Sequence, residues 1–183
     1  MTAFSGLNAA GELRALQNFS MPITQALNAL AVFVLPYAAR IHRDNGPAVL
    51  GRVMWKISGL FALGAFAYWA ALLVMRQPVI RLVYGSQYSE LGPLLPWVAA
   101  ASIPWTVAYV PAMALRAIRS SASVLLIYSA SSVIALLLGI PATRAFGLHG
   151  ALWTMLLSNL TVLVTALILV SGKVRTNMTG DRN

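Results

Sequence analysis

Four amides and one arginine near the N-terminus recur at intervals that place them on one face of a helix. At about 100° per residue they fall within an arc of about 100°, and the set is Arg14, Gln17, Asn18, Gln25 and Asn28. The opposite face carries Phe19, Ile23, Leu27, Leu30 and Val34. Amides in an apolar helix bind either a neighbouring helix or a polar ligand in a hydrated cavity. The spacing therefore predicts interhelical hydrogen bonding or a substrate-binding face, and leaves both open.

Residue types suited to catalysis or metal binding are sparse in the sequence. It has no cysteine, two histidines and four acidic residues, which are Glu12, Asp44, Glu90 and Asp181. The acids are too scattered to form a carboxylate pair, and no serine-hydrolase, zinc-protease or phosphate-loop motif occurs. We therefore expect a protein that is not an enzyme, with no catalytic residue, no metal site and no cofactor.

The composition is that of an integral membrane protein. Hydrophobic residues make up 59% of the 183 residues and charged residues only 9%, against about 25% charged residues in soluble domains. The net charge of +9 does not indicate nucleic-acid binding, because the basic residues flank apolar segments rather than forming one patch. We expect membrane lipid as a partner and no nucleic acid.

Five windows of 19 to 28 residues contain no Asp, Glu, Lys or Arg. About 20 apolar helical residues cross a bilayer core, so each window can hold one span. We expect an all-α membrane domain over 17–171, with spans at about 17–39, 55–75, 94–115, 122–143 and 150–171. An interfacial segment is expected at 78–90, and Gly147–Gly150 is expected to form a tight turn before the last span.

The distribution of basic residues predicts the orientation. Nine basic residues fall on the side that holds the loops after the first and third spans and the C-terminal tail, and four fall on the other side. The positive-inside rule then places the tail 172–183 in the cytoplasm and the N-terminal segment 1–16 outside. Arg40 and Arg43 would lie at the cytoplasmic mouth. No signal peptide accounts for an external N-terminus, so we expect a C-terminal piece of a longer protein, or a start that lies further upstream.

Pro104 and Pro111 stand inside the third expected span. An internal proline removes a helical hydrogen bond and kinks the helix. Broken helices occur in transporters that rock between two states, but kinks without a gating role are also common. Both interpretations of these expected helix kinks remain open.

Several short motifs resemble those of bacterial polysaccharide and O-antigen flippases. The run 9–18 (AAGELRALQN), followed by 34–40 (VLPYAAR), resembles the eighth helix of these proteins. The run 82–88 (LVYGSQY) resembles the outer-face motif before helix ten, and 146–151 (FGLHGA) resembles the start of helix twelve. These flippases belong to the multidrug/oligosaccharidyl-lipid/polysaccharide exporter superfamily. The motifs follow the family's order over nearly the whole chain, and a twelve-helix member has the same external start of helix eight and internal end of helix twelve.

The resemblance implies a function and a larger architecture. The family has two six-helix halves around a partly basic cavity, and it flips lipid-linked oligosaccharide across the inner membrane by alternating access. The five spans would correspond to helices 8–12, with the N-terminal half missing. The five residues of the polar arc would then meet the glycan or its phosphates, and Arg14 would supply the basic hydrogen-bond donor that a pyrophosphate needs.

Three other functions remain open. A drug/cation antiporter of the same superfamily would usually need an intramembrane carboxylate, and the spans offer none. An intramembrane glycosyl- or acyltransferase would have to use Glu90 or His149, which nothing in the sequence pairs. An inactive truncated remnant or an assembly partner would also fit the absence of an N-terminal half.

Overall fold

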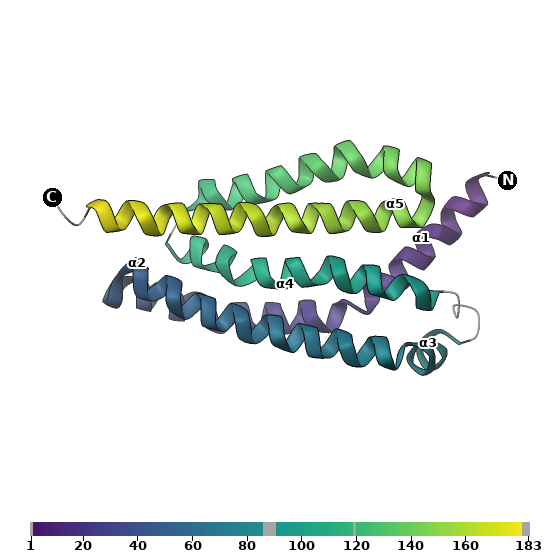
Figure 1. Ribbon diagram of the computed structural model, residues 1–183, viewed down its shortest axis with the longest axis horizontal. Helices are drawn as coiled ribbons and strands as arrows, with labels where there is room; N and C mark the ends of the chain where they lie inside the picture. Colours follow the sequence, from purple (N-terminus) through teal and green to yellow (C-terminus); the bar gives the residue numbers. More distant parts are fainter. Residues whose placement is uncertain (1, 86–90, 119, 181–183) are drawn as a thin grey trace.

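The computed structural model describes residues 2–85, 91–118 and 120–180. The elements in chain order are α1 (Thr2–Asn18), α2 (Met21–Val74), α3 (Arg76–Tyr84), α4 (Leu95–Ala117) and α5 (Ser121–Gly180). All of these elements are helices, and the described residues contain no strand (Figure 1). The predicted all-α class is confirmed.

The two longest elements, α2 and α5, are helical hairpins rather than single rods. Gly46 turns α2 with φ 80° and ψ 175°, and Gly147 turns α5 with φ 57° and ψ −131°. Positive φ costs glycine little, so each reversal falls on a glycine. The two turns lie at opposite ends of the molecule (Figure 1). A Cβ at Gly150 would overlap the Ala142 carbonyl group, which explains the second glycine of the predicted turn.

Four stretches are long and apolar enough to cross a membrane: Met21–Gly46, Ala48–Val74, Leu91–Ala117 and Ser121–Gly172. The last has 52 residues, far more than the roughly 20 that one crossing needs. The turn at Gly147 divides it into two arms, which contain the spans predicted at 122–143 and 150–171. The chain is thus a multi-pass helical membrane protein, and four stretches stand against the five predicted spans because the last stretch contains both arms of α5.

The first predicted span, 17–39, begins too early. In the structure α1 ends at Asn18, and α2 begins at Met21. Pro22 has no N–H to donate to the Asn18 carbonyl oxygen, and the chain instead makes tight turn bonds from Phe19 N to Leu16 O (3.2 Å) and from Ser20 N to Gln17 O (2.9 Å). The polar arc is therefore split between two helices and is not one continuous helical face.

The remaining boundaries differ by a few residues from those predicted. The span expected at 55–75 lies in Ala48–Val74, and that expected at 94–115 lies in Leu91–Ala117. The expected interfacial segment 78–90 contains most of α3, whereas residues 86–90 lie outside the described part of the chain. The N-terminal segment 1–16 lies in α1 except for its first residue, and the tail 172–183 continues α5 as far as Gly180.

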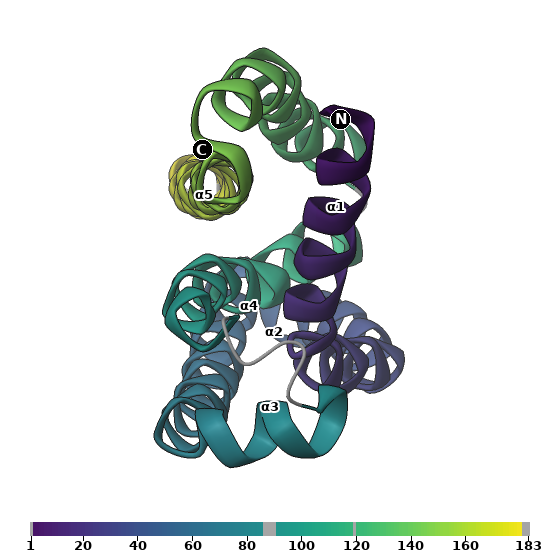
Figure 2. The same ribbon diagram turned by 90° about the vertical axis from the view of Figure 1, so that its right-hand side faces the viewer.

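Helix α4 is the centre of the bundle. In its most apolar stretch 72% of the residues are buried, whereas the share is 22%, 17% and 11% in the corresponding stretches of the other three candidate spans. Figure 2 shows the α2 hairpin on one side of α4 and the α5 hairpin on the other. Large apolar side chains are exposed on the outer arms: Leu60, Leu63, Phe66, Leu136, Leu137 and Ile140. Because a soluble protein does not expose so extensive an apolar surface, these arms face the bilayer.

The break between α1 and α2 is capped by two tyrosines. The Tyr84 hydroxyl donates to the Ala15 carbonyl oxygen (3.1 Å), and the Tyr68 hydroxyl donates to that of Phe19 (2.8 Å). The last carbonyl groups of a helix lack helical donors; the first bond supplies one to Ala15 near the end of α1, and the second supplies one to Phe19 in the junction. They fix the end of α1, with Leu16 buried, against the rest of the bundle.

Candidate functional site

A polar cavity of about 310 Å³ lies among the α1–α2 junction, α4 and the second arm of α5. We call it the polar cavity; its lining residues are Gln17, Ser20, Ile23, Thr24, Ser102, Trp105, Thr106, Met155 and Asn159. Most of them carry amides or hydroxyls, and none is ionised. Such groups both donate and accept hydrogen bonds. The lining therefore offers hydrogen bonds to an uncharged ligand, next to the apolar surface of Ile23, Trp105 and Met155.

Hydroxyl groups from the α1–α2 junction and from α4 meet at the wall of the cavity. The Ser20 and Ser102 hydroxyls are 3.0 Å apart and hydrogen-bonded, and the Thr106 hydroxyl donates to the Ser102 carbonyl oxygen (3.0 Å). A hydroxyl that donates to its own helix keeps acceptor lone pairs for another group. This wall can therefore accept hydrogen bonds from a ligand without losing its internal ones.

The Gln17 amide lines the cavity without a side-chain hydrogen bond of its own among the described residues. It is half-buried. The Asn159 amide, in contrast, donates to the Ala101 carbonyl oxygen (2.9 Å), and its oxygen remains free to accept from a ligand. The two amides reach the cavity from α1 and α5, so a ligand bound to both would bridge these two helices.

The five residues of the predicted polar arc have three different placements. Gln17 lines the cavity. The Asn18 amide donates to the Tyr84 hydroxyl (3.0 Å), and the Asn28 amide oxygen accepts from the Tyr109 hydroxyl (3.1 Å), as the interhelical alternative predicted. Gln25 and Arg14 are exposed. The structure thus brings only one of the five to the cavity wall.

Arg14 nevertheless lies close to the cavity along α1. It precedes Gln17 by three residues, and residues with this spacing share a helix face. Its side chain is exposed, so the guanidinium can reach a ligand that extends from the cavity past α1. A guanidinium at this place can bind a phosphate oxygen through charge-assisted hydrogen bonds.

The two arginines expected at the cytoplasmic mouth are both exposed near the end of the first arm of α2. Arg43 Nε lies 3.2 Å from Asp44 Oδ1, and the two side chains are 78% and 53% exposed. Such a pair contributes little stability, so Arg43 remains able to bind another anion. Arg40 is exposed one turn earlier.

The predicted kink residues Pro104 and Pro111 are both buried inside α4, which stays helical through them. Pro111 deprives the Val107 carbonyl oxygen of its helical donor, and the Ser58 hydroxyl donates to that oxygen instead (2.9 Å). The bond from Asn159 to the Ala101 carbonyl lies next to the corresponding gap of Pro104. The gap at Val107 is thus filled by a side chain of the α2 hairpin, whereas the α5 hairpin is attached one residue after Ala100, whose carbonyl oxygen loses its donor at Pro104.

A row of aromatic rings, which the sequence reasoning did not identify, leads from the polar cavity along α4. Trp105 lines the cavity, and its ring centroid is 6.2 Å from that of Tyr109 and 6.3 Å from that of Tyr128. Arg116 lies at the end of this row. It donates to the Tyr128 hydroxyl (3.2 Å), and its guanidinium carbon lies 5.8 Å from the centre of the Tyr128 ring. The spacing of Trp105, Tyr109 and Arg116 is helical and could have revealed this face of α4. Tyr128 belongs to another helix and could not be placed from spacing.

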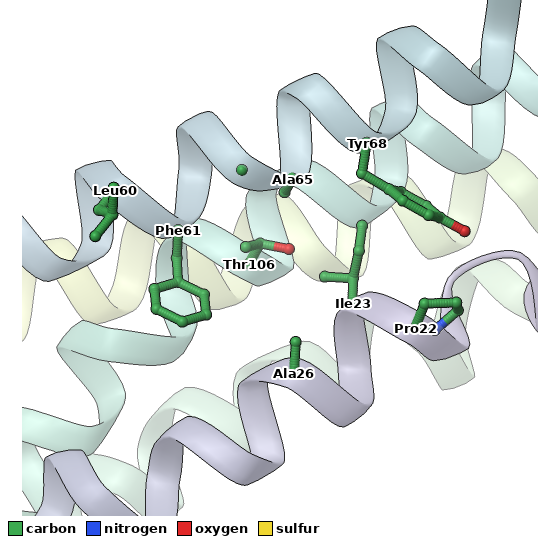
Figure 3. Close-up of a pocket in the computed structure, with 9 residues that line it drawn as sticks. Pro22, Ile23, Ala26, Leu60, Phe61, Ala65, Tyr68 and Thr106 are labelled. Atoms are coloured by element: carbon green, nitrogen blue, oxygen red, sulfur yellow. The ribbon is translucent and has the colours of Figure 1, made fainter.

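A second, apolar cavity of about 450 Å³ adjoins the first (Figure 3). We call it the apolar cavity; its lining residues are Pro22, Ile23, Ala26, Leu60, Phe61, Gly64, Ala65, Tyr68 and Thr106. Ile23 and Thr106 line both cavities. These two side chains therefore form the partition between a polar and an apolar space.

Neither a metal site in the described part of the chain nor a match to a known protein was found. The described residues contain no group of three or more His, Cys, Asp or Glu side chains that could hold a metal ion. No known family model, curated protein or solved structure matches the chain.

Proposed function

We propose that this chain is part of a membrane translocase that flips a lipid-linked oligosaccharide across the bacterial inner membrane by alternating access. The polar cavity carries the proposal. A wall of neutral amides and hydroxyls inside a lipid-facing bundle can bind sugar hydroxyls through hydrogen bonds alone. The uncharged sugars of the ligand also avoid the cost of placing an ion at membrane depth, and its phosphates would need the basic residues outside this cavity.

The resemblance to polysaccharide flippases supports the same function. The run 9–18 lies in α1, the helix that brings Gln17 to the polar cavity. The run 146–151 contains Gly147, which turns α5. Two of the motifs therefore coincide with features that shape the cavity or the bundle.

We propose that a second lobe covers the exposed face of the first arm of α2. Gln25 and Asn28 are exposed on this arm although they lie within a candidate span. Amides at membrane depth are stable only against protein or a water-filled cavity. The six-helix half that the resemblance implies would complete the cavity on this side, with Arg14, Arg40 and Arg43 along it as binding groups for the pyrophosphate.

The position of α4 supports a rocking motion between the hairpins. The bonds to the Val107 and Ala101 carbonyl oxygens come from side chains of the two hairpins, so they can break and re-form without unfolding α4. Movement of the α2 or α5 hairpin about this helix would open the polar cavity to one side of the membrane or the other.

Charge favours an orientation with the Gly46 turn in the cytoplasm. Arg40, Arg43 and Arg52 flank this turn, whereas Arg144 alone precedes the turn at Gly147. The positive-inside rule then places the C-terminus in the cytoplasm and the N-terminus outside.

Deletion of the gene in the source bacterium tests the function. We expect lipid-linked oligosaccharide to accumulate on the cytoplasmic face of the inner membrane, and export to return with a plasmid copy. The purified protein should show no glycosyl or acyl transfer to the lipid-linked precursor. Unchanged export after deletion would refute the translocase, and transfer by the purified protein would establish an enzyme instead.

A further inference from the structure

The apolar cavity is a gap between the two arms of α2, closed on its inner side by α4. Figure 3 shows Pro22 and Tyr68 at one end and Phe61 toward the other, with Ala26 and Ala65 between them. The small residues here leave the space between the arms unfilled, whereas the larger side chain of Leu27 nearby is fully buried. The cavity therefore arises from the sequence of the two arms.

Water is not a suitable occupant of this space. The hydroxyls of Tyr68 and Thr106 are the polar groups of its wall, and because they already donate to the carbonyl oxygens of Phe19 (2.8 Å) and Ser102 (3.0 Å), they offer water only acceptor lone pairs. A water molecule in a cavity needs two to four polar partners. The rest of the wall is hydrocarbon and supplies none.

An empty apolar cavity is also unfavourable, because its wall loses dispersion contacts on one side. The space is open to the bilayer: Ala26, Leu60 and Gly64 in its wall are exposed, and the neighbouring Leu63 and Phe66 are 65% and 61% exposed. Lipid hydrocarbon is the matter available at this depth and can enter from the side.

We propose that the apolar cavity binds one acyl chain of a membrane phospholipid, inserted between the two arms of α2. Its volume of about 450 Å³ lies in the range of ligand-binding pockets, about 300–1,000 Å³, and accommodates a segment of one chain. The bound chain packs against Ile23 and Thr106 and so separates the polar cavity from the bilayer. This site does not depend on whether the protein translocates glycans.

Photolabelling tests the site directly. The purified protein is placed in nanodiscs of phosphatidylethanolamine and phosphatidylglycerol with a trace of phospholipid that carries a diazirine on one acyl chain. After irradiation, labelled peptides are mapped by mass spectrometry. We expect residues 60–68 to be labelled several-fold more than residues 136–140, which include the exposed, lipid-facing side chains of Leu136, Leu137 and Ile140 on α5.

A matched pair of variants assigns the label to the cavity. Gly59 and Gly64 lie on the same arm, and a Cβ added at either meets no atom within 4 Å, but only Gly64 lines the cavity. Gly64→Leu should lower labelling of 60–68 to the level of 136–140, and Gly59→Leu should leave it unchanged. If Gly64→Leu fails to fold, Ala26→Leu on the other arm replaces it, with Ala29→Leu as its control.

Equal labelling of the two segments, or equal loss in both variants of a pair, would overturn the proposal. Labelling of 136–140 without labelling of 60–68 would also overturn it, because protein rather than lipid would then cover the cavity.

Discussion

The Ser58 hydroxyl donates a 2.9 Å hydrogen bond to the carbonyl oxygen of Val107, the residue whose helical donor Pro111 removes. Ser58 is only 1% exposed, so no solvent competes for this bond. A side chain of α2 thus replaces a backbone donor of α4. Pro111 therefore weakens the central helix at a place where the α2 hairpin is attached to it.

Ser58→Ala should destabilise the protein by about 1–2 kcal/mol, because it leaves a buried carbonyl group without a donor. The measurement is equilibrium unfolding in mixed micelles of increasing denaturing detergent. Ser129→Ala is the control, since Ser129 is an exposed serine of α5. In a Pro111→Ala background, which restores the backbone N–H, the effect of Ser58→Ala should fall toward zero. An equal effect in both backgrounds would show that the bond does not serve the proline gap.

Tyr68→Phe should loosen the junction between α1 and α2. It removes the donor to the Phe19 carbonyl oxygen, at a cost of about 1 kcal/mol. We expect faster hydrogen exchange in residues 16–24, measured by mass spectrometry, and no change in α5. Tyr37→Phe is the control, because Tyr37 is 50% exposed on the first arm of α2. Identical exchange in the two variants would mean that other contacts hold the junction.

The orientation can be read with single cysteines, because the protein has none of its own. Asn45→Cys lies beside the Gly46 turn and Ala145→Cys beside the Gly147 turn, and both positions are exposed. An impermeant maleimide should label Ala145→Cys in intact spheroplasts and Asn45→Cys only after the membrane is permeabilised. The reverse pattern would contradict the orientation derived from charge.

Arg14→Ala should lower glycan export at unchanged expression, because it removes the exposed guanidinium one turn before Gln17 on α1. Arg144→Ala serves as the control, since Arg144 is also exposed but lies before the Gly147 turn of α5 rather than one turn before Gln17 on α1. The readout is the amount of exported polysaccharide per cell. Wild-type export in Arg14→Ala would remove this residue from the substrate path.

The membrane fold could be predicted because burial in lipid constrains the sequence directly. A charge inside a span is costly, so windows without charge outline the spans, and the glycine needed for the left-handed turn at Gly147 was recognisable. The break at Phe19–Ser20 was missed, because a helical projection carried through Pro22 assumes a hydrogen bond that proline cannot donate.

The cavity could be predicted only in part, because its wall comes from distant segments. Gln17 was identified from its place in an amphipathic pattern. Ser20 and Ser102 meet although 82 residues separate them, and Asn159 reaches α4 from the last arm. No local pattern specifies which distant helix supplies the partner, so Asn18 and Asn28 were grouped with Gln17 although they bind tyrosines.

The central claim is that the polar cavity binds the glycan during translocation, and export by cavity variants tests it most directly. Gln17→Ala removes an amide that lines the cavity, and Gln77→Ala removes an exposed amide of α3. Both are expressed in the deletion strain, and surface polysaccharide is measured at matched protein levels. We predict reduced export for Gln17→Ala and full export for Gln77→Ala. Full export by Gln17→Ala, and also by Asn159→Ala, would contradict the account.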